Sequence, residues 1–442
     1  MIGYGFPYPI TFFEDEYMKK LNVVIIGAGN RGATYADIMA KYPEKYQVVG
    51  VAEPIESRRN YIRDKFAIPE NMCFTDYHPL FELGKVADVA VIATMDRLHF
   101  DPAMVAISLG YDLLLEKPIS PEPEECEKIS RAAKEKGVKV VVCHVLRYTD
   151  YFLTLKKLID SGRIGKIMSI NHEEDVGNVH QSHSFVRGNW GNSERSSCML
   201  LQKSCHDMDI LQWLIGAKPK KLQSFGTLSY FREENAPADA PERCTDGCPH
   251  LDTCPYNTIK IYYDDKDNTW FRTTCTRLAD PTDEDVMNSL KTTQYGKCVF
   301  KCDNDVVDHQ TVNMLFEGDV TVTFSMNAFN YGGRFTHIMG TKGEIKSKLA
   351  SRTKIELFDF EKREGEDIPI EKASDGISGG HGGGDEGIIL SLYKYVAEDI
   401  KTPSISEIDI SADNHLIVFA AEEARHKNTV VDFGEFKKGL LK

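Results

Sequence analysis

The first third of the chain alternates short apolar runs with amphipathic segments. Apolar runs at residues 23–26, 86–94 and 138–143 predict strands buried on both faces, as in a parallel sheet. Shorter strands are expected at residues 47–52 and 112–115, and helical periodicity appears at residues 33–41, 102–109 and 121–136. This alternation predicts a doubly wound α/β domain over residues 21–144.

Beyond Arg147 the pattern changes to longer strands in which apolar and polar residues alternate. Such strands are predicted at residues 166–173, 221–230, 306–316, 320–328 and 334–340. Helices are predicted at residues 152–161, 199–215, 387–399 and 411–426, and a loop at residues 177–197. We therefore expect residues 1–20 to be an N-terminal extension and residues 145–442 to form an α+β domain with a large, mostly antiparallel open sheet. This second domain carries a polar, cysteine-bearing insertion at residues 233–305.

A glycine-rich turn follows the first strand directly. Its G-x-G-x-x-G pattern joins a buried strand to an amphipathic helix, which is the context of a Rossmann dinucleotide site. The first glycine permits the tight turn, the second lets a pyrophosphate approach, and the third lets the helix pack on the strand. We expect cofactor contacts from Gly27, Gly29, Asn30, Arg31 and Gly32.

An acidic residue ends the second strand. Glu53 lies 21 residues after Gly32, where a carboxylate binds the hydroxyls of the adenosine ribose. A carboxylate at this place repels a 2′-phosphate, so NAD is favoured over NADP. Arg58 and Arg59 follow closely enough to keep NADP as the minority alternative.

Composition and charge exclude several classes of protein. The chain has 442 residues, of which 42% are hydrophobic and 27% charged, as in globular proteins with more than one domain. Its formal net charge of −14, without a basic cluster, argues against a nucleic-acid surface. No apolar run has the length of a membrane span, and residues 1–17 do not resemble a secretory signal. We therefore expect no membrane partner and a cytoplasmic location.

Part of the eleven cysteines gathers in the insertion. Cys244, Cys248, Cys254 and Cys275 are soft ligands in a polar segment, where thiolates suit a structural zinc ion. Their spacing is not a standard zinc pattern. Reduced thiols in an irregular insertion are the alternative, and the sequence leaves both open.

Five motifs resemble one oxidoreductase family. They are Glu116-Lys117-Pro118, Ala93-Thr94 with His99, Leu146-Arg147-Tyr148 with the segment 158–165, Cys205-His206-Asp207-Met208-Asp209 with Trp213-Leu214, and Met339-Gly340-Thr341-Lys342-Gly343. These motifs, and their order along the chain, are similar to those of the glucose–fructose oxidoreductase / inositol dehydrogenase / MocA family. The resemblance implies a Rossmann domain, an α/β domain that often forms dimers or tetramers, and hydride transfer between NAD(P) and a hydroxyl carbon of a sugar or cyclitol.

The resemblance also suggests catalytic roles. His206 is the expected base for the hydroxyl proton, because an imidazole titrates near neutral pH. Lys117 is expected to hydrogen-bond the reacting oxygen, and Thr94, His99 and Glu116 to lie with it beside the cofactor.

The helix of the expected base departs from the family pattern. Members of the family often have an acid four residues before the histidine, where this chain has Gln202. A glutamine orients an imidazole but does not stabilise its positive charge. Lys203 is on nearly the same helix face as His206, so it is a further candidate catalytic group.

Gln202 and four further residues are expected to bind substrate. Asp209 is one turn after His206, so it is a candidate partner for substrate or imidazole. Tyr148 is a further acid/base candidate, Trp190 an aromatic surface for a sugar ring, and His309 part of a polar strand entry.

Three functions remain open from the sequence. The first is a net sugar or cyclitol dehydrogenase. The second is a redox-neutral glycosidase that oxidises a hydroxyl, eliminates the glycosidic group, adds water and re-reduces the product. The third is a non-catalytic NAD-binding sensor.

Overall fold

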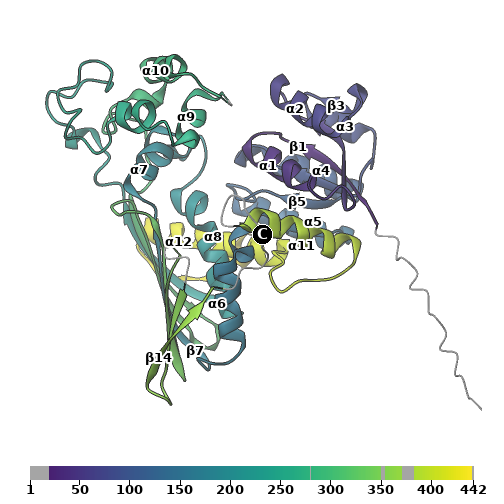
Figure 1. Cartoon of the computed structure of the whole chain (residues 1–442). Helices are drawn as coiled ribbons and strands as arrows, with labels where there is room; N and C mark the ends of the chain where they lie inside the picture. The colour runs from purple at the N-terminus through teal and green to yellow at the C-terminus, as the bar shows by residue number, and fades with distance from the viewer. Residues whose placement is uncertain (1–18, 279, 350–353, 371–382, 441–442) are drawn as a thin grey trace, which may run out of the picture.

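The computed structural model describes residues 19–278, 280–349, 354–370 and 383–440 (Figure 1). Its N-terminal domain contains a six-stranded parallel sheet with the order β3-β2-β1-β4-β5-β6. These strands are β1 (Leu21–Ile26), β2 (Tyr46–Ala52), β3 (Cys73–Phe74), β4 (Val89–Ile92), β5 (Asp112–Leu115) and β6 (Val140–Val142). The helices between them are α1 (Asn30–Met39), α2 (Glu56–Phe66), α3 (Tyr77–Glu82), α4 (Phe100–Leu109) and α5 (Pro123–Lys136). The predicted doubly wound domain is confirmed.

The second sheet is mostly antiparallel, with the order β14-β13-β12-β11-β7-β10-β9-β8-β15 among the described residues. Only its β7–β10 pair is parallel there. The strands are β7 (Ile167–Asp175), β8 (Pro219–Thr227), β9 (His309–Phe316), β10 (Thr321–Asn327), β11 (Gly333–Gly340), β12 (Gly343–Lys348), β13 (Lys354–Asp359), β14 (Glu364–Pro369) and β15 (Val431–Asp432). The expected class of fold is confirmed for this domain as well.

Helices cover one face of the second sheet. α6 (Asp150–Asp160), α8 (Met199–Ile215) and α12 (Ile408–Lys427) share one hydrophobic core with the inward side chains of the strands. α12 joins both domains, since Ala412 packs in a core of the N-terminal domain and Leu416 in the core of the second sheet. The short helix α13 (Phe433–Gly439) follows β15. The expected dimer or tetramer stays a prediction.

The last third of the chain also contributes to the N-terminal domain. Helix α11 (Gly384–Ala397) lies beside that domain in Figure 1. Its Ile388, Ile389 and Leu392 are fully buried in one core with strands β1, β2 and β4. The core of the nucleotide domain is therefore built from segments far apart in the sequence.

Two segments differ from the expected pattern. Residues 178–187 were expected to be a loop, but they are helical. The short helix α7 (Asn178–His180) continues into a π-helix at Gln181–Arg187. The insertion also contains helices α9 (Thr269–Thr276) and α10 (Asp283–Thr292), which stand beyond the end of the second sheet in Figure 1. Separate small cores hold this region together, so its sequence lacks a single strong period. No helix in the described residues has the length and hydrophobicity to cross a membrane.

Candidate active site

The glycine turn has the geometry of a dinucleotide cradle. Gly27 has a φ of +88°, and a Cβ atom added there would lie 2.6 Å from the backbone oxygen of Ala93. A Cβ on Gly32 would lie 2.0 Å from the backbone oxygen of Gly27. Gly29 is open, with no atom nearer to such a Cβ than a guanidinium nitrogen of Arg58 at 3.9 Å. The chain thus closes tightly on the strand side and leaves its outer side free for a pyrophosphate.

Glu53 is fixed at the end of β2. Its Oε2 accepts a hydrogen bond from the amide of Ala28 at 2.7 Å, and its Oε1 accepts one from the amide of Ile55 at 2.9 Å. The side chain of Arg59 donates to the backbone oxygen of Glu53 rather than projecting away from it. This arrangement holds an acid beside the glycine turn, which fits the ribose of NAD.

Arg31 of the turn is tied to the protein itself. Its guanidinium donates to Glu116 at 2.8 Å, to the Tyr35 hydroxyl at 2.6 Å and to Asp385 of α11 at 2.5 Å. Burial opposes ionisation of Glu116, but Arg31 and Lys117 outweigh burial and lower its pKa. Arg31 and Glu116 therefore form a buried brace behind the turn.

Lys117 extends from the carboxyl end of β5 to helix α8. Its Nζ lies 3.5 Å from the backbone oxygen of Gln202, one helical turn before His206. Its amide donates to the carboxylate of Glu116 at 2.9 Å, so the Lys117 backbone is held by the same brace. The structure thus brings the two expected catalytic residues to one place.

A histidine that the sequence analysis missed lies against His206. The ring of His144 is edge-on to the ring of His206, with centroids 5.7 Å apart and an interplanar angle of 80°. His144 is fully buried, and neither of its ring nitrogens has a hydrogen-bond partner among the described residues. Burial, Arg147 and Lys117 hold its pKa well below the usual range, so the ring is neutral. Its position just after β6, at the same sheet edge as Lys117, was the available signal.

Asp209 has a different place from the one expected. It is fully buried and accepts hydrogen bonds from Nε and Nη2 of Arg147 at 2.7 and 2.6 Å. The Asn414 amide donates to Oδ1 at 2.7 Å, and Nε2 of His144 lies 3.9 Å from the same oxygen. Asp209 was expected to contact the substrate or His206. In the structure its carboxylate instead forms an ion pair with Arg147.

Comparisons with known proteins agree with this geometry. Residues 21–144 match the model described as "Oxidoreductase family, NAD-binding Rossmann fold", and residues 156–375 match "Oxidoreductase family, C-terminal alpha/beta domain" of the same GFO_IDH_MocA family. The chain belongs to this oxidoreductase family. The expected NAD-binding Rossmann domain is therefore confirmed.

Several named proteins are similar to this chain. The putative oxidoreductase YteT of Bacillus subtilis is 24% identical and covers 84% of this chain and 88% of its own length. A 2,7-anhydro-N-acetylneuraminate hydratase of Mediterraneibacter gnavus is 28% identical over 47% of this chain and 53% of its own length. Among solved structures, levoglucosan dehydrogenase in complex with NADH and levoglucosan has a TM-score of 0.68 at 17% identity, covering 94% of this chain and all of its own.

Lys203, the third candidate catalytic residue of this oxidoreductase, belongs to a buried network of alternating charges. Nζ of Lys203 lies 3.0 Å from Glu174 of β7, whose second oxygen lies 2.6 Å from Arg334. Arg334 also donates to Asp207 at 2.6 Å, and His172 lies 3.0 Å from Asp207. Burial opposes ionisation of Asp207, but Arg334 and His172 lower its pKa far below the usual range. Lys203 thus belongs to a nearly neutral network beneath α8.

The remaining predicted residues are distributed around this centre. The side-chain amide of Gln202 donates to Asp96 at 2.9 Å and to Ser197 at 2.8 Å, so it ties α8 to the loop after β4. His99 is buried, with Nδ1 2.7 Å from the backbone oxygen of Pro118 and Nε2 3.1 Å from that of Thr94.

Three residues lie apart from the contact of Lys117 with α8. Tyr148 packs in the core of the N-terminal domain, where burial raises its pKa to about 12. Trp190 lies against Phe185 in the loop before α8, and His309 begins β9 with Nδ1 2.7 Å from Asp308.

The cysteine set differs from the expected one. Cys244, Cys248 and Cys254 line one cavity of about 250 Å³ together with Cys298. Cys275 lies elsewhere, buried in the core of α9 and α10. Across the described ranges, no group of three or more histidine, cysteine or carboxylate side chains is arranged to hold a metal ion. The structure therefore does not support the expected zinc site.

Proposed function

We propose that this protein uses NAD to oxidise a hydroxyl carbon of a sugar, a sugar derivative or a cyclitol. The contact of the Lys117 ammonium with the backbone of Gln202, one helical turn before His206, carries this proposal. Lys117 comes from the edge of the nucleotide-binding sheet and His206 from the helix of the second domain. The reacting hydroxyl of a substrate bound between them would be near the cationic Lys117 and the base His206.

The chemistry follows from the charges that develop in the reaction. The glycine turn and Glu53 would hold NAD, and the bound cofactor would supply the hydride acceptor. Loss of the hydride turns the hydroxyl carbon into a carbonyl carbon, so the hydroxyl proton must leave for a base, which is His206. Lys117 donates a hydrogen bond to the same oxygen and stabilises its negative charge while the proton leaves. Gln202 and the Arg31–Glu116 brace fix these groups in position.

His144 is proposed as a positioning residue for His206. A buried neutral imidazole without a hydrogen-bond partner costs about 1–3 kcal/mol, and such groups in folded proteins call for an explanation. Its edge-on contact with His206 supplies one, because the ring packs against the imidazole of the proposed base. His144 therefore helps to hold the ring of His206 in one orientation.

A redox-neutral glycosidase is the second candidate. It is supported by the relatives named as anhydroneuraminate hydratases and by Lys203, which follows Gln202 on α8 and provides a further acid/base group. In that reaction the oxidised sugar loses its glycosidic group, gains water and is reduced again. A non-catalytic NAD sensor is the third candidate, which the contact of Lys117 with α8 one helical turn before His206 disfavours.

Absorbance at 340 nm separates these functions. The purified protein is incubated with NAD and a panel of hexoses, uronic acids, inositols and their glycosides. A steady rise of NADH with free sugars or inositols supports the dehydrogenase. Release of the aglycone from a glycoside without net NADH supports the glycosidase. NAD binding without either reaction refutes both and leaves the sensor. His206→Asn is the matched control for turnover, and His426→Asn, at an exposed histidine, is the control for loss of an imidazole.

A further inference from the structure

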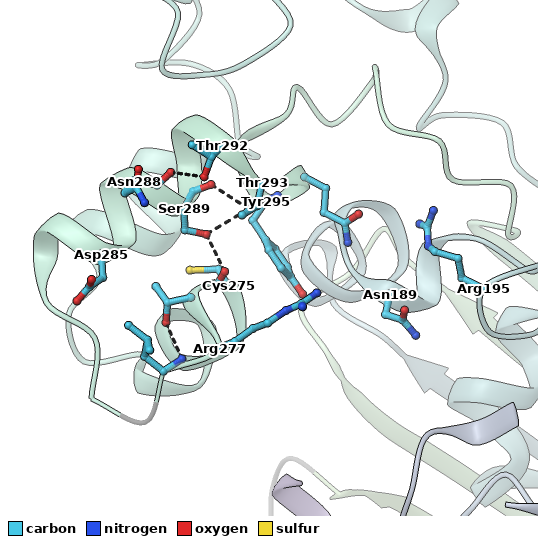
Figure 2. Close-up of a pocket in the computed structure, with 13 residues that line it drawn as sticks. Asn189, Arg195, Cys275, Arg277, Asp285, Asn288, Ser289, Thr292, Thr293 and Tyr295 are labelled. Carbon is cyan, nitrogen blue, oxygen red and sulfur yellow. Dashed lines mark hydrogen bonds between the residues drawn. The ribbon is translucent and has the colours of Figure 1, made fainter. Parts of the chain in front are cut away.

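A second pocket lies between the insertion and the loop that precedes α8 (Figure 2). Its volume is about 540 Å³, within the range of sites for small molecules. Arg277, Asn288 and Tyr295 line it from the insertion, and Asn189 and Arg195 from the loop. In Figure 2 the side chains of Arg277 and Tyr295 extend across the pocket toward Asn189. None of the reaction steps above uses this pocket.

The pocket lining suits a polyhydroxylated ligand. Its polar side chains are mainly amides and hydroxyls, which both donate and accept hydrogen bonds as sugar hydroxyls require. They include Asn189, Thr276, Asn288, Thr292 and Gln294. The ring of Tyr295 adds an apolar surface. The lining also contains the carboxylate of Asp285, whose Oδ2 accepts hydrogen bonds from the amide and hydroxyl of Thr282 at 2.9 and 2.6 Å.

The charged groups of the lining are two arginines, Arg195 and Arg277, and one carboxylate, Asp285. Arg195 forms an ion pair with Asp303. In the part of the chain that the structure describes, no carboxylate lies within ion-pair distance of Arg277. Its guanidinium therefore offers a fork of donors that matches a carboxylate. The ligand that fits is a sugar unit with an acidic group.

The loop that lines this pocket also borders the active site. Ser197 accepts a hydrogen bond from the Gln202 side chain at 2.8 Å, and Ser196 donates to Asp96 at 3.1 Å. Gln202 is one helical turn before His206. Asn189 thus stands at the start of this short loop, and Arg195 comes directly before the two serines that contact Asp96 and α8.

The helical segment 178–187 makes a second link. The ring of Tyr295 stacks on His183 with centroids 5.3 Å apart, and His183 contacts Trp270. Trp270 is edge-on to His180 at 5.3 Å. Burial lowers the pKa of His180, and the neighbouring Lys203 lowers it further. Successive ring contacts therefore lead from Tyr295 of the pocket lining to His180, which lies close enough to feel the charge of Lys203.

We propose that this pocket binds an acidic sugar unit attached to the unit that is oxidised, so that the substrate contains at least two sugar units. This inference rests on the proposed oxidation of a sugar hydroxyl, and it assigns the specificity of that reaction to the insertion. Arg277 binds the carboxylate, and the amides of Asn189 and Asn288 bind ring hydroxyls.

Four probes separate the second ring from the carboxylate: glucose, glucuronate, cellobiose and cellobiouronate. Their binding to the full chain with NADH present is measured by calorimetry. We expect cellobiouronate to bind at least tenfold more tightly than the other three. Arg277→Asn removes the charge at a left-handed position that asparagine tolerates, with a φ of 61°. We expect it to abolish this preference while glucose binding changes less than twofold.

Lys291→Asn is the matched control, because Lys291 is an exposed cation on α10 outside the pocket lining. Equal affinities of wild type and Arg277→Asn for cellobiouronate, or no binding of this probe, would overturn the proposal. A parallel loss of glucose binding in Arg277→Asn would also overturn it, since the residue would then act on the reacting unit. NADH formation with the same probes is recorded separately. Arg277-dependent binding without NADH formation refutes the oxidation alone, and NADH formation without any effect of Arg277→Asn refutes the pocket alone.

Discussion

Replacing Asp209 with asparagine distinguishes a structural carboxylate from a catalytic one. Asp209 and Arg147 are each 1% exposed or less and share two hydrogen bonds of 2.6–2.7 Å. Burial raises the pKa of the Asp209 carboxyl and Arg147 lowers it, so the carboxylate is tolerated there as part of the pair. Asparagine has a similar size but leaves the guanidinium with the backbone oxygen of Ile405 as its other described acceptor, at 3.1 Å.

The expected loss is the cost of an uncompensated buried charge. Removal of one partner from a buried ion pair typically costs about 3–5 kcal/mol of unfolding free energy. We expect Asp209→Asn to lose this amount in urea unfolding followed by tryptophan fluorescence. The double variant Asp209→Leu/Arg147→Met removes both charges and should recover a large part of the loss. Asp160→Asn, which breaks an exposed pair with Lys156, is the control and should cost about 1 kcal/mol or less.

The same variant tests the interpretation made from sequence. A direct role of Asp209 on substrate or on His206 predicts normal stability and a large loss of turnover. The buried pair predicts the opposite for protein that remains folded, with NADH affinity unchanged within about twofold. A loss of stability below about 1 kcal/mol would therefore refute the structural argument.

Three further predictions concern the cradle and its surroundings. Lys117→Met and His206→Asn should each lower kcat by about 10²–10⁴-fold, with the Kd for NADH unchanged in a fluorescence titration; a normal kcat would remove the residue from the mechanism. Gly29→Ala should weaken NADH binding and keep the thermal midpoint, whereas Gly32→Ala should lower the midpoint, because its Cβ meets backbone at 2.0 Å; equal midpoints would contradict this packing. Burial and a neighbouring arginine lower the pKa of His183 to about 3, so the unfolded chain binds its proton first as the pH falls below about 6.5. Unfolding free energy should then fall by up to about 1.4 kcal/mol per pH unit toward pH 3, and His183→Phe should remove this part of the slope; an unchanged slope would refute it.

The sequence predicted the regular elements well because their signals are local. The strands of the N-terminal sheet are nearly all apolar. Short apolar runs of this kind are typical of strands that are buried on both faces of a parallel sheet. Helix α8 has the predicted bounds Met199–Ile215, since Gly216 ends it in a left-handed conformation with a φ of 70°. The glycine turn was recognised from a local pattern, although Gly27 also approaches the backbone of Ala93 at the end of β4.

The site depended on contacts between distant segments, which a single sequence does not encode locally. Asp209 is an obvious candidate on a catalytic helix until the buried Arg147 is known to face it across 62 residues of chain. His144 follows an ordinary buried strand, and only the fold places its ring on His206. The cysteines show the converse case, because nearness along the chain suggested a set from which the structure removes Cys275.

The brace between Arg31 and Asp385 bears on how this enzyme can be divided or recombined. The two residues are 354 positions apart, yet they meet behind the turn that is expected to hold the cofactor. A fragment ending near residue 144 would keep every glycine of the turn but expose the core that Ile388 and Leu392 fill. Exchange of nucleotide domains between relatives must therefore transfer α11 with them, because the core around β1, β2 and β4 is incomplete without it.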